Sequence, residues 1–349
     1  MKLSPSLENN PDIDSWLQFH CDGKITVSTG KVELGQKLIT AFTVIVAEEL
    51  DVDPGRIIVI SADTSGSPNE GYTAGSNSME SSGMALRQVA AKVRHVLLEK
   101  ASQQLGVQVE NLYVNDGEIS SSLTNQSVTY MELTGGKNFN IKVSEDVVPK
   151  RHDQYHLIGN KVPGIGYEDL VTGATTFVQD LELPGMLHAR VVRPRGYHAR
   201  LQELNEKYVR EMPGVVGVVV DGSFLAVVCE REEQAVQASI RLSGLAIWNE
   251  SKEINTENIF IQLKKNTRQS LPVTKGIAEL SAVPSIKTPQ NSAQTISATY
   301  QRPYHMHASV APSAAMALYV DQEIRVWTHS QGVYLSLIHI SEPTRPEPI

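Results

Sequence analysis

The end of this sequence limits how much of the chain can fold as one protein. Residues 335–345 read LSLIHISEPTR, which is, residue for residue, the translation of a transposase adapter used to prepare DNA libraries. Cloning and sequencing scars are excluded from a fold. The alternative is a mobile, Pro-rich terminus. We therefore expect residues 335–349 to be an adapter artefact with few native contacts, and we interpret residues 1–334 as an N-terminal fragment of a longer protein.

The composition is that of an ordinary globular protein. Hydrophobic residues make up 41% of the chain and charged residues 20%, which is ample for a core. The formal net charge of −8 argues against nucleic acid as the main partner, because phosphate binding needs a basic surface. No apolar run is long enough for a membrane span, and the N-terminus lacks the apolar segment of a secretory signal. We therefore expect a cytoplasmic protein, with co-export to the periplasm on a partner as the alternative.

The first part of the chain, residues 1–135, has the pattern of mixed helices and strands. Apolar periodicity and turn residues predict a strand at 24–28, a helix at 38–50, a strand at 56–61, a helix from about 79 to 105 and a hairpin at 111–119. Gly106 stands where a left-handed helix C-cap is expected. Residues 136–162 are polar and irregular, and we expect a linker there.

A second unit is expected at residues 163–250. The predicted elements are a strand at 186–192, a hairpin of strands at 215–220 and 224–229, and a helix at 230–242. Residues 251–294 are polar and poorly patterned, as is typical of a connecting segment. Residues 295–334 begin a third unit, with strands expected at 296–300 and 324–328.

The first candidate binding feature is the glycine-bearing turn before the helix at 38–50. Free N–H groups and the helix dipole favour an anion at such a helix N-terminus. Gly35 and Gln36 lie at this point. The stretch from Gly30 is a near miss to a nucleotide P-loop, because Gln36 stands where that loop needs lysine. An ordinary tight connection is the alternative.

The second candidate feature is the stretch 71–78, with the sequence GYTAGSNS, before the long helix. Small side chains let the backbone approach a ligand closely, and Ser76, Asn77 and Ser78 can cap the helix or donate outward. A well-capped surface loop is the alternative. Because two such loops occur in one unit, we expect Gln36 and residues 75–78 to face a common pocket for one anionic ligand.

The third candidate feature is a pair of histidines. His305 and His307 share one face if their segment is a strand. A metal site needs a third ligand, and none is suggested by the spacing, so a buried pair or a pocket lining are the alternatives. Cys21 and Cys229 stand alone and are expected to be small buried groups. Any iron–sulfur cluster would therefore sit on another chain.

Together these stretches resemble the xanthine dehydrogenase/aldehyde oxidase superfamily of molybdenum hydroxylases, in particular the large-subunit type of isoquinoline 1-oxidoreductases and nicotinate dehydrogenases. The matching stretches are 29–36, 63–64 with Pro68 and 73–78, 173–180, 183–194, 212–216, 302–312 and 327–334. The resemblance implies an α+β molybdenum-hydroxylase large-subunit fold in permuted order. An α/β-hammerhead domain at 163–250 would lie between molybdopterin-binding segments at 1–135 and 295–334.

The resemblance also implies a function. The chain would bind molybdopterin, in its cytosine dinucleotide form, with molybdenum, and oxidise an aromatic N-heterocycle or an aldehyde with water as the oxygen source. Electrons would pass to iron–sulfur clusters on a small partner subunit, with a cytochrome as a further acceptor. The residues carried over are Gly35, Gln36, Gly75, Ser76, Asn77 and Ser78 for cofactor binding, and Ala74, His305 and His307 for the substrate pocket.

This chain departs from the family's pattern in two ways. Lys37 replaces the last glycine of the first turn, which costs energy if the backbone there has a positive φ. Alternatively, Lys37 pairs with a phosphate of the cofactor. No residue matches the family's general-base glutamate, which lies toward its C-terminus, so no catalytic residue is assigned. A non-catalytic cofactor-binding or assembly protein with the same loops is the alternative function.

Overall fold

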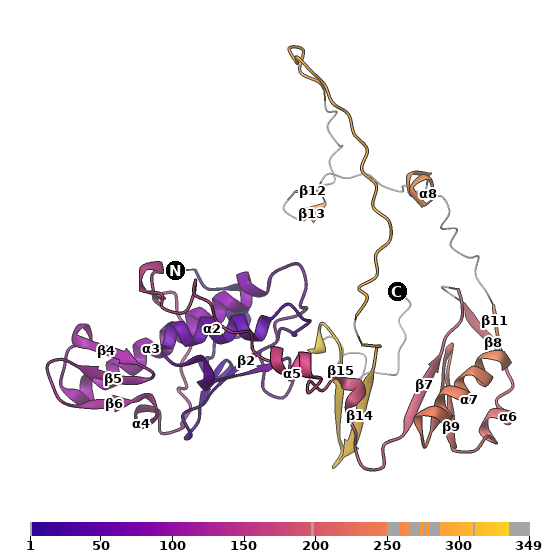
Figure 1. The fold of residues 1–349 in the computed structure, drawn as a ribbon, viewed down its shortest axis with the longest axis horizontal. Helices are drawn as coiled ribbons and strands as arrows, with labels where there is room; N and C mark the ends of the chain where they lie inside the picture. Colours follow the sequence, from indigo (N-terminus) through magenta and orange to yellow (C-terminus); the bar gives the residue numbers. More distant parts are fainter. Residues whose placement is uncertain are drawn as a thin grey trace. The chain divides into compact units, whose positions relative to one another are not determined.

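The computed structural model describes residues 2–196, 199–249, 259–265, 273–274, 277–278, 287–309 and 311–334 (Figure 1). The chain divides into two units, one made of residues 1–181 with 311–349 and the other of residues 182–310. Both units mix helices with strands, as the predicted α+β class requires. The adapter-like stretch 335–349 lies outside the described residues, so its expected lack of native contacts stays a prediction.

The first unit is built on a small sheet crossed by a helix. Its strands are β1 (Leu17–Phe19), β2 (Ile25–Thr29) and β3 (Ile57–Ser61), in that order, with β1 antiparallel and β3 parallel to β2. The parallel pair needs a crossover, which α2 (Leu38–Leu50) supplies. The predicted helix at 38–50 is confirmed residue for residue. Cys21 is exposed in the β1–β2 turn, so the expectation of a buried thiol was wrong there, whereas Cys229 is buried.

A second long helix packs against the first. α3 (Met84–Leu105) lies beside α2 (Figure 1), and Gly106 caps it with φ +65°, as predicted. The predicted start near residue 79 is a π-helix at Ser78–Gly83. Trp16, Phe42 and Leu86 are fully buried in the core of this unit. Phe42 and Leu86 lie near the starts of α2 and α3, so burial in the core holds the helix start that follows each candidate loop.

A second sheet completes the N-terminal part. Its strands are β4 (Leu112–Asn115), β5 (Glu118–Ser121) and β6 (Ser127–Thr129), and the expected hairpin turn is present at Asp116–Gly117, where both residues have positive φ. The other short elements of this unit are α1 (Pro5–Asn9), α4 (Tyr130–Thr134) and α5 (Tyr167–Thr172), with 3₁₀ turns at Ile13–Ser15, Pro54–Arg56, Val109–Asn111, His152–Gln154 and Val178–Asp180.

The other unit contains a three-stranded antiparallel sheet in the order β7 (His188–Val192), β10 (Phe224–Cys229), β9 (Val215–Asp221). The predicted helix is α7 (Glu232–Leu245), and its buried side packs on this sheet. Smaller elements of this unit are α6 (Lys207–Arg210), α8 (Ile259–Lys265), β8 (Arg200–Leu204) paired with β11 (Ala246–Asn249), and β12 (Val273–Thr274) paired with β13 (Ile277–Ala278).

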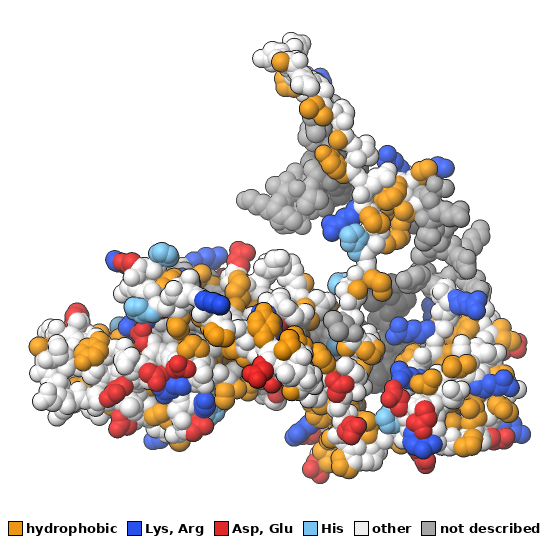
Figure 2. Space-filling view, viewed as in Figure 1, with side chains coloured by type: hydrophobic (Ala, Val, Ile, Leu, Met, Phe, Trp, Pro, Cys, Tyr) orange, Lys and Arg blue, Asp and Glu red, His pale blue; other side chains and the backbone are white. Residues whose placement is uncertain are grey.

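The C-terminal residues return to the first unit as a hairpin of β14 (Ala315–Val320) and β15 (Glu323–Thr328). The predicted strand at 324–328 is confirmed, and β14 was missed. The predicted strand at 296–300 was wrong, because these residues are exposed and have no pairing partner among the described residues. No helix in the described residues is long and apolar enough to cross a membrane. On the face drawn in Figure 2, acidic and basic side chains are interspersed.

Candidate cofactor site

The turn before α2 is closed by one of its own carboxylates. Glu33 Oε1 accepts hydrogen bonds from the N–H groups of Gly35 and Lys37, each at 2.9 Å, and Oε2 accepts from Ile39 N–H at 3.1 Å. A helix N-terminus favours a carboxylate through its free N–H groups and its dipole. Glu33 therefore occupies N–H groups that were expected to face an outside anion.

Gln36 folds back onto the same turn. Its Nε2 donates to Val32 O at 3.0 Å, and its Oε1 accepts from Leu34 N–H at 2.5 Å. Gly35 and Gln36 are both exposed, and no atom lies within 4 Å of the position of a Cβ on Gly35. The Gln36 amide can contact a ligand through these atoms only by sharing or exchanging one of these bonds. Its contact with a cofactor stays a prediction.

Lys37 has the strained backbone that its position suggested. Its φ is +62°, in the left-handed region that glycine adopts without cost. Its ammonium lies 3.7 Å from the centroid of the Tyr167 ring, at the start of α5. A cation over an aromatic ring is attracted by the ring's negative face. The Lys37 side chain therefore has a partner within its own unit.

The second candidate loop is exposed and polar where it was expected to bind. Ala74, Gly75, Ser76 and Asn77 are exposed, and Gly75 and Ser76 have φ of +65° and +60°. The alternative of a well-capped loop is not found at Asn77, which makes no side-chain cap bond and whose backbone is already helical. The side chains of Ser76, Asn77 and Ser78 make no hydrogen bond to the rest of the described chain. They are therefore available to an outside polar group.

The bases of the two candidate loops are bonded to each other. Val32 N–H donates to Thr73 Oγ1 at 2.7 Å, and Lys31 Nζ donates to the carbonyl oxygens of Glu70 at 2.7 Å and Tyr72 at 2.9 Å. A Cβ on Gly30 would lie only 2.2 Å from Pro68 O, so this close approach requires glycine. The structure brings the loops together at their bases, while the common pocket expected between Gln36 and residues 75–78 stays a prediction.

The segment after β15 also contacts the second loop. Gln331 Nε2 donates to Thr73 O at 3.1 Å, and Gln331 O accepts from Thr73 N–H at 2.9 Å. Tyr334 OH donates to Ser67 O, and a Cβ on Gly332 would meet the Tyr72 ring. Two stretches that separately resembled cofactor-binding parts of the family thus meet in one unit.

The predicted histidine pair is exposed and outside regular secondary structure. His305 and His307 belong to the other unit, and both are exposed in a stretch without helix or strand. The expectation of a shared strand face was wrong, because this stretch pairs with no neighbouring strand among the described residues. Within the same described part of the chain, no three His, Cys, Asp or Glu side chains are grouped to hold a metal ion.

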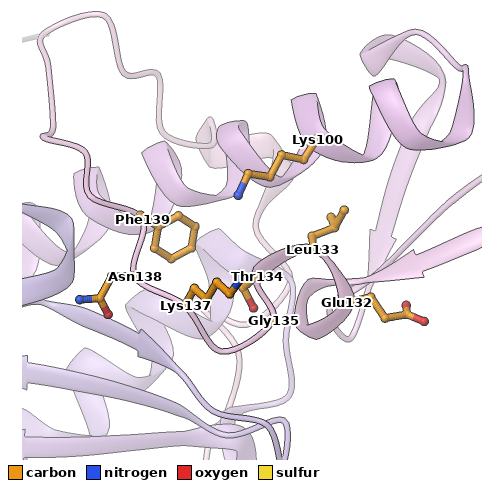
Figure 3. Close-up of a pocket in the computed structure, with 8 residues that line it drawn as sticks. All are labelled: Lys100, Glu132, Leu133, Thr134, Gly135, Lys137, Asn138 and Phe139. Carbon is orange, nitrogen blue, oxygen red and sulfur yellow. The ribbon is translucent and has the colours of Figure 1, made fainter.

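Two cavities lie away from the candidate loops. One, of about 330 Å³, is lined by Lys100, Glu132, Leu133, Thr134, Gly135, Lys137, Asn138 and Phe139 (Figure 3). The Lys100 ammonium lies 5.8 Å from the centroid of the Phe139 ring at this cavity. The other, of about 480 Å³, includes Asp51, Asp53 and Asp116 in its wall, and each of these carboxylates already accepts a hydrogen bond within the unit. Neither cavity contains a predicted site residue.

Comparison with known proteins places the candidate loops in a known domain. Residues 2–163 match the family model described as a molybdopterin cofactor-binding domain. One component of the nicotinate dehydrogenase of Pseudomonas putida is 33% identical over 325 residues, which cover 90% of this chain and 26% of that protein. The chain belongs to the molybdopterin-binding xanthine dehydrogenase family. The family model covers both candidate loops.

Further members and neighbours of this family match as well. The beta-subunit of the isoquinoline 1-oxidoreductase of Brevundimonas diminuta is 27% identical over 272 residues, covering 67% of this chain and 35% of that protein. The chain therefore spans only about a quarter to a third of the length of these relatives. The crystal structure of a Cu,Mo-CO dehydrogenase covers 36% of this chain and 17% of that chain, with 23% identity and a TM-score of 0.32.

The second loop fits the cofactor of this xanthine dehydrogenase family. A molybdopterin presents polar ring atoms and a phosphate, which need hydrogen-bond donors on accessible backbone and short side chains. The loop offers the side chains of Ser76, Asn77 and Ser78, which make no hydrogen bond among the described residues, next to a glycine with positive φ. The first turn fits less directly, because Glu33 already accepts from its N–H groups.

Proposed function

We propose that this chain forms part of the cofactor site in the molybdopterin-binding subunit of a molybdenum hydroxylase that oxidises N-heterocycles or aldehydes. The observation that carries the proposal is the loop 74–78, exposed at residues 74–77, whose polar side chains make no hydrogen bond to the rest of the described chain. Its base is bonded to the first turn through Val32 and Thr73. The match of residues 2–163 to a molybdopterin cofactor-binding domain supports this cofactor as the ligand of that loop.

We propose separate roles for the cofactor, the loop 74–78 and the first turn. When bound, the molybdenum cofactor supplies the oxidation of an electrophilic carbon, with water as the source of oxygen. Ser76, Asn77 and Ser78 donate hydrogen bonds to the cofactor, and Gly75 lets the backbone approach it. Gly35 and Gln36 line the same site from the first turn.

The remaining assignments extend this proposal to the whole subunit. We propose that Ala74, His305 and His307 line the substrate pocket, and that the general-base glutamate lies outside residues 1–334. The proposed order is permuted, with cofactor-binding segments at 1–135 and 295–334, a linker at 136–162, an α/β-hammerhead domain at 163–250 and a connecting segment at 251–294. The proposed cofactor form is the cytosine dinucleotide.

The proposed partners follow from the same family. A small iron–sulfur subunit receives the electrons, with a cytochrome as a further acceptor. The proposed location is cytoplasmic, with co-export to the periplasm as the alternative. Catalysis is favoured over a non-catalytic assembly role, because the relatives that match most of the chain are named as components of a dehydrogenase and an oxidoreductase.

The test is to express the full-length gene product with its iron–sulfur partner. Molybdenum is measured by elemental analysis, cytidine monophosphate is measured after acid release, and dye-linked oxidation is assayed with nicotinate, isoquinoline and an aldehyde. We expect about one molybdenum per chain and turnover of at least one substrate. A complex that holds molybdenum but oxidises none of these compounds would support the assembly role, and a complex without molybdenum would overturn the proposal.

A further inference from the structure

Glu70 joins three segments of the first unit through one carboxylate. Its Oε2 accepts from Thr29 Oγ1 at 2.6 Å and from Gly30 N–H at 2.9 Å. Its Oε1 accepts from Ser6 Oγ at 2.7 Å and from Ser82 Oγ. An ionised carboxylate has about four acceptor positions, and four donors from α1, the end of β2 and the π-helix fill them. The acceptor capacity of Glu70 is therefore fully used.

Lys31 makes the reverse connection. It is buried, and its ammonium donates to the carbonyl oxygens of Glu70 and Tyr72. Burial lowers the pKa of Lys31, while the charge of the Glu70 carboxylate acts in the opposite direction. The Lys31 ammonium of the first turn therefore bonds the backbone of the second loop, and the Glu70 carboxylate of the second loop bonds the backbone of the first turn. Hydrogen bonds that involve a charged group are stronger than neutral ones.

These bonds close the second loop at both ends. The bond from Ser82 to Glu70 ties the π-helix back to a residue 12 positions earlier. At the near end, Thr73 Oγ1 accepts from Val32 N–H. Residues 74–78, of which 74–77 are exposed, lie between these two hydrogen bonds. Their separation from the first turn is therefore set by residues that lie outside the exposed stretch.

We propose that Glu70 and Lys31 are positioning residues, which hold residues 74–78 and the first turn at the spacing that the molybdenum cofactor needs. This inference rests on the proposed function of the loop. The two side chains act through the loop backbone, so they are distinct from the residues proposed to contact the cofactor. The family assignment alone does not point to them, because their role follows from contacts across about 40 positions of sequence.

The first experiment measures amide hydrogen exchange in the full-length gene product without cofactor. The variants are Glu70→Gln and Lys31→Met, and the matched controls are Glu110→Gln and Lys161→Met at exposed positions. We expect the amides in 71–78 that donate hydrogen bonds, those of Gly71, Thr73 and Asn77, to exchange about tenfold faster in the first pair, with α3 unchanged, because local opening is governed by local contacts. Lys31→Arg, which keeps the charge and the donors, should exchange like the wild type.

Two results of this experiment would overturn the positioning role of Glu70 and Lys31. One is unchanged exchange at 71–78 in both variants. The other is faster exchange spread evenly over α2, α3 and the loop, which would indicate a general loss of stability. If Lys31→Met fails to fold, the test rests on Glu70→Gln alone. Faster exchange at 71–78 with α3 still protected then supports the proposal, and either of the two results above overturns it.

The second experiment uses the full-length complex with its iron–sulfur partner. We expect Glu70→Gln to lose molybdenum about tenfold faster than Glu110→Gln during dilution, with an unchanged KM for substrate in the loaded fraction. A wild-type complex without molybdenum would overturn the proposed function itself. A loaded wild type with equal molybdenum loss in Glu70→Gln and Glu110→Gln would overturn the positioning role alone.

Discussion

Thr73 and Gln331 are 258 positions apart in the sequence and bond each other twice. Thr73 N–H donates to Gln331 O at 2.9 Å, and Gln331 Nε2 donates to Thr73 O at 3.1 Å. Such reciprocal bonding satisfies both backbone groups of Thr73, as a neighbouring strand would. The C-terminal segment after β15 therefore supports the base of the second candidate loop.

The first prediction concerns this support. Gln331→Ala removes the bond from Nε2 and leaves the backbone bond in place. We expect the free energy of unfolding to fall by about 0.5–1.5 kcal/mol, the usual contribution of one hydrogen bond. Urea unfolding measures this change, with Gln301→Ala at an exposed position as the control. Equal stability of the two variants would show that the side-chain bond contributes nothing.

The sequence predicts those elements of the first unit whose signals are local. The helix at 38–50 follows from apolar spacing, and the hairpin turn at Asp116–Gly117 follows from residues that tolerate positive φ. Gly106 is predicted as a C-cap for the same reason. β14 was missed because its alanines weaken the strand signal. The start of α3 as a π-helix has no apolar period that would reveal it.

The candidate site is only partly predictable, because its contacts are long-range. The sequence placed small and polar residues in both loops, and the structure brings the bases of these loops together. Glu33, Lys31 and Glu70 were not predicted as contributors. Glu33 acts within its own turn, where a carboxylate three positions after a glycine carries no specific signal. Glu70 and Lys31 bond across about 40 positions, where local patterns give no information.

The second prediction tests the backbone strain at Lys37. Both Lys37→Gly and Lys37→Ala remove the ammonium from the Tyr167 ring, and only glycine adopts φ near +62° without strain. We therefore expect Lys37→Gly to be more stable than Lys37→Ala by about 1 kcal/mol. Urea unfolding of the two variants checks this. An alanine variant that equals or exceeds the glycine variant in stability would contradict the strained conformation.

The third prediction concerns Glu48 and pH. Its carboxylate is buried and accepts from the N–H groups of His156, Leu157 and Ile158. Burial raises the pKa of this carboxyl, but the donated N–H groups and the nearby Lys150 ammonium outweigh burial, so the pKa is lowered from 4.5. A lowered carboxyl pKa stabilises the fold above the unfolded value, and this contribution is lost as the pH falls through the folded value.

The corresponding variant is Glu48→Gln. At pH 7 we expect it to lower the free energy of unfolding by about 1–3 kcal/mol, because the charged acceptor is lost. The difference from the wild type should narrow as the pH falls below the unfolded value of 4.5. Urea unfolding over this pH range measures it, with Glu110→Gln as the exposed control. A difference that stays constant with pH would show that the charge of Glu48 is not what stabilises the segment 156–158.

The fourth prediction concerns residues 1–334 expressed alone. The chain spans only 26% and 35% of the two relatives described above, and the general base is proposed to lie outside it. We expect this fragment to hold far less than one molybdenum per chain and to be inactive, since base catalysis typically contributes about a hundred- to ten-thousandfold in rate. Elemental analysis and dye-linked assays check this. Stoichiometric metal with turnover would show that the active site has been misplaced.

The central claim is that the loop 74–78 binds the molybdenum cofactor. The most direct measurement is the molybdenum content of the full-length complex with Asn77→Ala, beside Asn125→Ala at an exposed position in the β5–β6 connection. If the claim holds, Asn77→Ala lowers the molybdenum content per chain several-fold at unchanged thermal stability, and Asn125→Ala matches the wild type. Equal molybdenum content in all three proteins would contradict the claim.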